Sequence, residues 1–506
     1  MTGLISKHYN RLLEFCLETV KTMKTTLIFS LAFFISINSP LTAQHEDSPS
    51  EVHNKIDHFL ERGIENGFAG AIAVIKNGKE IINKGYGLAD QKKQQLNKPN
   101  TIFDIGSNTK QFTATAILKL FEMGELNLED PLKLYFEDLP EDKQNITIHQ
   151  LLSHTSGIVD AIGNDFDETS QDKFFKQVFS TPLLSEPGRL FSYSNIGYSI
   201  LGRIIELVGN AEYEAFLNKY LFTPAHMTQT GYLLPKWDTT NVSRSYNRGI
   251  LESESPIFKY QRNGTISWHL KANGGINSTQ NDMLLWYEAL KSNTVISEES
   301  FKKLTTPYAN YPNSELNYGY GWTIRSANND LKRIAHNGSN GAYAHTLIWF
   351  TEEDIYISYA TNANSEEVEY IAYDIAKMLL DETFNPQPIK NNVYAYSLDF
   401  IDKNNIDKSE DLITLLKQKY PDHFTNSRLL NSVGNILLMI NKHQNWSVEI
   451  FKRNIELYPN DGNLWDSLGD GYMSINKIDE ASKSYQKAID LGYKDSQYKL
   501  DQIIKN

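Results

Sequence analysis

Three short polar motifs in this 506-residue chain carry side chains that could catalyse acyl transfer. The first, Ser107-Asn108-Thr109-Lys110, places an alcohol three residues before an amine and leads into apolar residues at helical spacing. Ser107 is therefore expected at a helix N-terminus, with Lys110 about one turn on and on the same face. There the helix dipole and free backbone N–H groups favour a developing oxyanion. For an isolated motif, an ordinary N-cap serine remains the better interpretation.

The second candidate is the tripeptide Tyr193-Ser194-Asn195. A lysine beside a tyrosine stabilises the phenolate, so Lys110 could lower the pKa of Tyr193 enough for the phenol to accept the Ser107 proton. The tripeptide pattern is common in this chain. Without Ser107 nearby, a packed aromatic ring with a hydrogen-bonded hydroxyl is the favoured interpretation.

The third candidate, His336-Asn337-Gly338-Ser339, is the only His-x-Gly in the chain and stands at the end of a predicted strand. Gly338 would let a substrate backbone lie against the strand edge, and the Ser339 N–H could supply a second oxyanion donor. Taken singly, a strand histidine bonded to a neighbouring group is the favoured interpretation of His336.

No pattern in the sequence indicates a metal or a cofactor. The 12 histidines include no pair at i, i+4 spacing, and the glycine fingerprints of nucleotide-binding loops are absent. The net charge of −13 argues against a nucleic-acid partner, because phosphate binding needs clustered Lys and Arg. Cys16 is the only cysteine, which excludes an internal disulfide.

The elements that must position the motifs are strands near both ends of the main domain, with helices between them. A helix is expected over residues 52–66, and the apolar run 70–75 followed by Asn77-Gly78 predicts a hairpin. The pattern predicts an α/β (α+β) fold: an antiparallel sheet closed by distant segments and flanked by helices, with a helical lobe. Later strands are expected over residues 320–324, 333–336, 345–350 and 355–360.

Shifts in composition divide the rest of the chain. Two prolines, Pro386 and Pro388, break both helix and strand, so we place the main domain at residues 44–385 and a linker at 386–424.

Residues 425–506 resemble tetratricopeptide repeats, which predicts a small all-α domain. Two such units should dock on the main domain or on a protein partner, although a helical cap that binds nothing is about as consistent. In the clearer unit the motif residues are Trp465, Leu468, Gly469, Tyr472, Ala481, Tyr485 and Ala488. The upstream unit repeats the pattern with one residue inserted, and its motif residues are Leu430, Val433, Gly434, Leu437, Phe451 and Pro459.

The first residues predict export. Lys21 and Lys24 precede the apolar run 27–37, and Ala43 offers a small residue at a cleavage site. This pattern is typical of a secretory signal covering residues 1–43, whereas spanning a membrane takes about 20 apolar residues. Met23 is the natural first residue of that signal. The mature chain is therefore expected to be periplasmic or secreted, with no stable membrane span.

Together, the three motifs resemble those of the serine β-lactamase-like, penicillin-recognising hydrolases, which include class C β-lactamases, D-Ala-D-Ala carboxypeptidases, D-aminopeptidases and related esterases. Ser-x-x-Lys, Tyr-x-Asn and Lys/His-x-Gly come in the family's order over about residues 50–380. The connecting runs 151–157 and 274–279 are also similar to the family's. His154, within the first run, is expected to be structural.

The resemblance implies a role for each motif residue. Ser107 would be the nucleophile, and Lys110 and Tyr193 would handle its proton. Asn195 would contact a substrate amide, and His336 would be the third-motif residue. The predicted substrate and oxyanion contacts are Asn195, His336, Gly338 and Ser339.

One departure from the family pattern concerns the substrate. The β-lactamase and penicillin-binding version usually ends in Lys-Thr-Gly, whereas this chain has His336-Asn337-Gly338. An imidazole with an ordinary pKa of ~6.5 is mostly neutral at pH 7 and gives a substrate carboxylate no lasting positive charge. We therefore predict an exported serine hydrolase that acts through an acyl-enzyme on a small-molecule or peptide ester or amide, with esterase or peptidase chemistry favoured over β-lactam hydrolysis. The alternative is a catalytically idle fold that binds a cell-envelope protein through its helical repeats.

Overall fold

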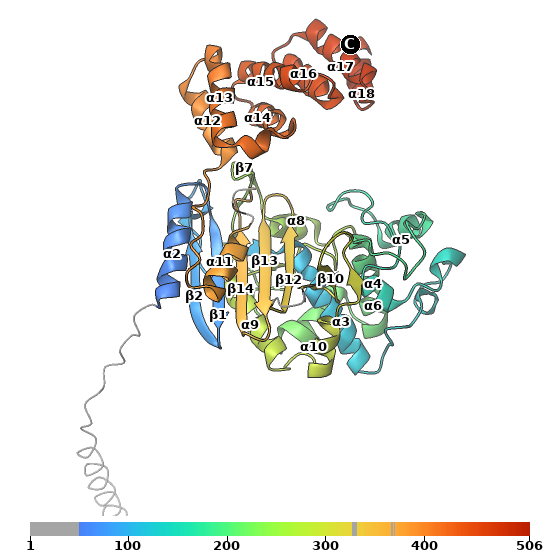
Figure 1. Ribbon diagram of the computed structural model, residues 1–506. Helices are drawn as coiled ribbons and strands as arrows, with labels where there is room; N and C mark the ends of the chain where they lie inside the picture. Colours follow the sequence, from blue (N-terminus) through green and yellow to red (C-terminus); the bar gives the residue numbers. More distant parts are fainter. Residues whose placement is uncertain (1–49, 326–330, 366–367, 369, 506) are drawn as a thin grey trace, which may run out of the picture. The chain divides into compact units, whose positions relative to one another are not determined.

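The computed structural model describes residues 50–325, 331–365, 368 and 370–505 (Figure 1). Its main feature is an eight-stranded sheet in which neighbouring strands are antiparallel throughout. The strand order β2-β1-β14-β13-β12-β11-β10-β9 confirms the predicted sheet closed by distant segments. The strands of this sheet are β1 Gly70–Lys76, β2 Lys79–Tyr86, β9 Ala309–Asn310, β10 Leu316–Tyr318, β11 Thr323–Arg325, β12 Arg333–Ser339, β13 Ala344–Phe350 and β14 Ile355–Thr361.

The β1–β2 hairpin forms because its two turn residues can adopt the positive φ angles that a two-residue turn requires. Asn77 and Gly78 have φ angles of 53° and 69°, in the left-handed region that Asn and Gly tolerate best. Helix α2 (Glu51–Ile64) precedes the hairpin, as predicted.

Both faces of the central strands are covered by other parts of the chain. The alternation of side chains along β14 sends Tyr356 and Tyr359 to opposite faces. Tyr356 donates a hydrogen bond to the carbonyl of Met283 in α9 (Gln280–Lys291), and Tyr359 donates one to the carbonyl of Val368, each at 2.8 Å. Consequently, every residue of β13 and β14 is buried.

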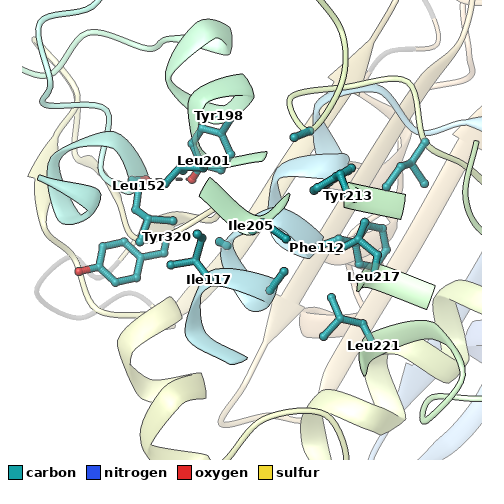
Figure 2. Packing of buried hydrophobic residues seen from close by; sticks show 14 of the residues in the cluster. Phe112, Ile117, Leu152, Tyr198, Leu201, Ile205, Tyr213, Leu217, Leu221 and Tyr320 are labelled. Carbon is teal, nitrogen blue, oxygen red and sulfur yellow. Dashed lines mark hydrogen bonds between the residues drawn. The ribbon is translucent and has the colours of Figure 1, made fainter. Parts of the chain in front are cut away.

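Helix α3 (Thr109–Glu122) runs through the core of the helical lobe, with most of its residues buried. Figure 2 shows Phe112 and Ile117 of α3 near Leu201 and Ile205 of α6 (Asn195–Gly209). The ring of Phe112 lies 4.7 Å from that of Trp286 between centroids. Because burying a large apolar side chain contributes about 1.5–3 kcal/mol, these contacts hold α3 firmly in place. The other helices of this part are α4 Ile148–Leu152, α5 Gln171–Ser180, α7 Tyr213–Leu217, α8 Pro256–Asn263, α10 Glu298–Leu304 and α11 Ile371–Leu380, with short helical turns η1 Gly106–Asn108, η2 Leu132–Leu134, η3 Glu141–Lys143 and η4 Asn218–Phe222.

The strand expected over residues 320–324 is wrong in its position. Strand β10 ends at Tyr318 and β11 begins at Thr323, so the predicted span falls largely in the turn between them. Gly321 makes this turn with a φ of 75°, and a Cβ there would lie 2.7 Å from the carbonyl oxygen of Lys110. The short strands β9 and β10 of this sheet and six strands outside it were also not predicted, since two or three residues are too few to show alternation. The six are β3 Leu88–Asp90, β4 Gln95–Leu96, β5 Phe103–Asp104, β6 Ser245–Asn247, β7 Leu251–Ser253 and β8 Asn277–Ser278.

The C-terminal region is entirely helical, and no helix or strand lies between Leu380 and Val393. Helices α14, α16 and α18 begin 34 residues apart, as do α15 and α17. The ring of Phe451 packs against Gly434, and the ring of Tyr485 packs in the same way against Gly469. The elements are α12 Val393–Lys403, η5 Ile406–Lys408, α13 Ser409–Lys419, η6 Pro421–Phe424, α14 Arg428–Met439, α15 Gln444–Leu457, α16 Gly462–Ser474, α17 Ile478–Asp490 and α18 Ser496–Lys505.

The predicted export signal, residues 1–43, lies outside the residues that the structure describes. Within the described residues, none of the helices combines the length and apolar character needed to cross a membrane.

Candidate active site

Ser107 lies in the short helical turn η1, between a strand and the buried helix α3. The strand β5 pairs with β8, and the Ile105 N–H extends this pairing by donating to the carbonyl of Ile276 at 2.9 Å. Across residues 101–118, Ser107 is the only residue that is not buried. The structure thus presents this one hydroxyl at the surface of a rigid core. The alternative interpretation of Ser107 as an ordinary N-cap is wrong, because Asn108 takes the cap position of α3.

Lys110 is fully buried, and its ammonium or amine group lies within reach of Ser107. Its Nζ is 3.3 Å from Ser107 Oγ, and it donates to Asn195 Oδ1 at 2.6 Å and to the carbonyl oxygen of Asn273 at 2.7 Å. Burial lowers the pKa of Lys110 to about 7, although the charges of Asp160 and Asp165 act in the opposite direction. A large fraction of Lys110 is therefore a neutral amine near pH 7, which is the form that can accept a proton.

Tyr193 completes the group around the serine. Its side chain is hydrogen-bonded to Ser107, and Lys110 Nζ lies 4.8 Å from the centre of its ring. Burial raises the pKa of Tyr193 well above its ordinary value, and the Ser107 hydrogen bond only partly opposes this. The expectation of a phenolate is therefore wrong for this state of the protein. The lysine faces the ring of Tyr193, and Tyr193 is a neutral phenol.

Asn195 is the first residue of α6 and is bonded within the protein. Its Oδ1 accepts from Lys110, while its backbone N–H and its Nδ2 both donate to Asp160 Oδ1 at 3.0 Å. Neither Asp160 nor Asn273 was predicted as part of the site. Asn273 directly precedes the recognised run 274–279, whereas nothing in the sequence around Asp160 pointed to it.

His336 lies in the middle of β12, not at the end of its strand as predicted. It is 5% exposed, and burial together with the nearby Lys110 charge lowers its pKa to about 3. The ring is therefore neutral, and both nitrogens are bonded: Nδ1 donates to the carbonyl of Asn337 at 2.7 Å, and Nε2 accepts from the Tyr318 hydroxyl at 3.0 Å. At pH 7 the buried His336 therefore carries even less positive charge than an imidazole with its ordinary pKa.

Gly338 brings β12 directly against the turn that carries the serine. A Cβ at Gly338 would lie 2.5 Å from the Ser107 backbone nitrogen and would also overlap the carbonyl oxygen of Ile105. A Cβ at Gly106 would in turn lie 2.6 Å from the Ser339 backbone nitrogen. The backbone nitrogens of Ser107 and Ser339 therefore belong to segments in close contact, as two oxyanion donors require.

Gly338→Ala is expected to lower kcat/KM by about 10²-fold or more, because the added methyl group must push β12 away from the Ser107 turn. The matched control is Gly197→Ala, whose Cβ would lie 3.4 Å from its nearest neighbour, in the first turn of α6. Steady-state kinetics with a chromogenic ester would measure both variants. Equal activity of the two would contradict the close approach.

His154 supports the Tyr193 segment, in agreement with its predicted structural role. It has a φ of 58°, its Nδ1 accepts from the Ser194 N–H at 3.1 Å, and its carbonyl accepts from the Ser192 N–H at 2.8 Å. Its ring lies 4.2 Å from that of Tyr193 between centroids. Burial lowers the pKa of His154 well below its ordinary value, so this ring is neutral too.

The mixed fold, an antiparallel sheet with many helices, is like that of the serine beta-lactamase family. A family model described as Beta-lactamase matches residues 52–380. The chain therefore belongs to the Beta-lactamase family of serine hydrolases.

The chain is also similar to individual proteins, at modest sequence identity. The chain is similar to Protein flp of Staphylococcus aureus (strain NCTC 8325 / PS 47), with 30% identity over 340 residues, which is 64% of this chain and 64% of that protein. It is 32% identical over 272 residues to the Putative penicillin-binding protein PbpX of Bacillus subtilis (strain 168), covering 54% of this chain and 65% of that one. Among solved structures, the octameric penicillin-binding protein homologue from Pyrococcus abyssi is similar with a TM-score of 0.57 and 25% identity, over 70% of this chain and 82% of that chain. The chain thus spans less than two thirds of these curated relatives' length.

The described residues contain no group of three or more His, Cys, Asp or Glu side chains that could hold a metal ion.

Proposed function

We propose that this protein is an exported serine hydrolase that cleaves an ester or amide through a Ser107 acyl-enzyme. The observation that carries the proposal is a buried amine with a pKa of about 7, placed 3.3 Å from the hydroxyl of a partly exposed serine. Burying a charged lysine is unfavourable, so this arrangement would not stabilise the fold if Lys110 had only a structural role.

In the first step, neutral Lys110 takes the Ser107 proton while Ser107 Oγ forms a bond to the substrate carbonyl carbon. The negative charge moves to the carbonyl oxygen, which the backbone N–H groups of Ser107 and Ser339 stabilise. Collapse of this intermediate breaks the bond to the leaving group and leaves an acyl-serine. Water then attacks the acyl-serine in the same manner and frees Ser107.

Tyr193 acts in this scheme as a neutral proton donor. Its hydroxyl is hydrogen-bonded to Ser107 and its pKa is raised, so at neutral pH it holds a proton. It can pass that proton to the leaving group while protonated Lys110 replaces it. The leaving group thereby departs as a neutral alcohol or amine, which lowers the barrier to collapse.

The neutral third motif favours substrates without a carboxylate next to the reacting bond. With a pKa of about 3, His336 offers no positive charge at neutral pH. Relatives include a protein named as a putative penicillin-binding protein, so β-lactams belong in the comparison. The test is a panel of short acyl p-nitrophenyl esters, D-amino-acid peptides and β-lactams such as nitrocefin. We expect turnover of the uncharged esters to exceed that of nitrocefin. Failure to turn over any of the three classes would favour an idle, partner-binding fold.

The activity is expected to depend on pH through Lys110. Its pKa is lowered to about 7, so the amine is protonated below that pH and loses its ability to accept the Ser107 proton. The value of kcat/KM for an uncharged ester should therefore rise with pH up to about 7 and level off above it. A profile flat from pH 5 to 9 would rule out Lys110 as the base.

Export and a partner for the helical region are further parts of the proposal. The signal pattern of residues 1–43 supports a periplasmic or secreted location, which N-terminal sequencing of the mature protein would test. The 34-residue spacing of the C-terminal helices supports tetratricopeptide-like repeats over residues 425–506, a class that binds proteins.

A further inference from the structure

The proposed reaction leaves one buried charged group beside the nucleophile without a role. Asp104 is the last residue of β5, three residues before Ser107, and it is 3% exposed. Its Oδ1 accepts a hydrogen bond from the Gly106 N–H at 2.7 Å. Its Oδ2 accepts one from Asn340 Nδ2 at 2.8 Å. The two carboxylate oxygens therefore bind two different segments of the chain.

Asn340 belongs to the turn between β12 and β13, directly after Ser339. Its Oδ1 accepts from the backbone N–H groups of Ala342 and Tyr343, at 3.1 and 2.9 Å. The side chain of Asn340 thus organises its own turn and at the same time donates to Asp104. The Asp104 carboxylate connects the turn before Ser107 to the turn that follows Ser339.

We propose that Asp104 is a positioning residue that sets the distance between the two oxyanion donors, the backbone N–H groups of Ser107 and Ser339. The inference rests on the proposed function. Because Gly106 and Gly338 lack a Cβ, these segments can touch. The two hydrogen bonds of the Asp104 carboxylate connect the segments. Because an oxyanion hole works only at a defined donor spacing, a small shift of either turn reduces transition-state stabilisation.

Only the ionised carboxylate can accept both hydrogen bonds fully, because protonation converts one oxygen into a donor. Burial raises the pKa of Asp104 to about 6, with its two hydrogen bonds acting the other way. The ionisable groups that act on Asp104, or on which it acts, are Asp165, Tyr260 of α8 and Tyr343 in the turn before β13, and none of them is a cation. The connection is therefore made above about pH 6 and is lost below it.

The first test replaces Asp104 without changing its shape. In Asp104→Asn, the amide oxygen can still accept from Gly106, but its NH₂ group faces the NH₂ group of Asn340. We expect kcat/KM to fall about 10- to 100-fold, mainly through kcat, because the lost interaction acts on the oxyanion. Asn340→Asp should lower kcat/KM by a similar factor, since it places two carboxylates face to face. The double variant Asp104→Asn/Asn340→Asp restores one donor and one acceptor and should recover most of the activity.

The second test separates positioning from general stability. In the wild-type protein, the slope of log kcat/KM against pH should increase from about 1 towards about 2 as the pH falls below 6, because Asp104 is then protonated as well as Lys110. Asp104→Asn should show only the Lys110 protonation. Glu214→Gln is the matched control: Glu214 is also a buried carboxylate with a raised pKa, and it accepts from the backbone of residues 232–234 in another part of the fold. This variant should keep the two-proton profile.

Wild-type activity and wild-type pH dependence in Asp104→Asn would overturn the inference, as would loss of the second protonation in Glu214→Gln. Failure of the double variant to recover activity, although folded by circular dichroism, would also overturn it. These results leave the proposed function intact as long as turnover depends on Ser107. Turnover that is independent of Ser107 would instead overturn both.

Discussion

Ser107→Ala is expected to lower kcat/KM by about 10³-fold or more, because it removes the atom that forms the acyl bond. The residual rate would come from the oxyanion donors and substrate binding, which remain. The fold should survive, since Ser107 is partly exposed and its truncation leaves no cavity in the core. Turnover of an activated ester, with a thermal melt of the same sample, measures both effects.

The chain offers a matched control for this variant. Ser170 also begins a Ser-x-x-Lys sequence at a helix N-terminus, where its Oγ accepts from the Lys173 N–H at 3.4 Å as an ordinary cap of α5. Ser170→Ala should cost about 1 kcal/mol of stability and leave kcat/KM within about twofold of wild type. Equal turnover by Ser107→Ala and the wild-type protein would show that Ser107 is not the nucleophile.

Lys110→Met is expected to lower kcat/KM by about 10²- to 10⁴-fold, the range that general bases contribute. Methionine fills much of the same buried space but cannot accept a proton. Lys110→Arg separates two roles of the lysine: a guanidinium keeps a positive charge but stays protonated, so it should not restore activity if Lys110 is the base.

The control for these variants is Lys119→Met, on the same helix. Lys119 donates to the carbonyl of Val295 at 2.9 Å and pairs with Glu122, away from Ser107. It should retain wild-type turnover. Recovery of activity in Lys110→Arg would mean that Lys110 acts through its charge and does not take the proton.

Much of the sheet could be predicted because its long strands show strong local patterns. The Asn77-Gly78 turn and the apolar runs of β1, β13 and β14 each identify a strand from a few neighbouring residues. The turn at Gly321 could not be predicted in this way. Gly321 is needed there because a Cβ would lie 2.7 Å from the carbonyl oxygen of Lys110, which is far from it in the sequence.

The site shows the same division between local and long-range information. Ser107 and Lys110 are three residues apart, so helical spacing alone predicted their proximity. The other partners of Lys110, Asn195 and Asn273, lie 85 and 163 residues from it and meet it only in the folded chain. The raised pKa of Tyr193 was missed for a related reason, since burial in the folded protein outweighs the effect of a nearby cation.

In the proposed mechanism, Lys110 activates Ser107 as a nucleophile. The most direct test of this activation is to treat the full-length protein with a fluorophosphonate at pH 8 and to map the modified peptide by mass spectrometry. We expect a single adduct on Ser107, formed much more slowly in Lys110→Met and at the wild-type rate in Lys119→Met. An unmodified Ser107, or an adduct that forms equally fast without Lys110, would contradict it.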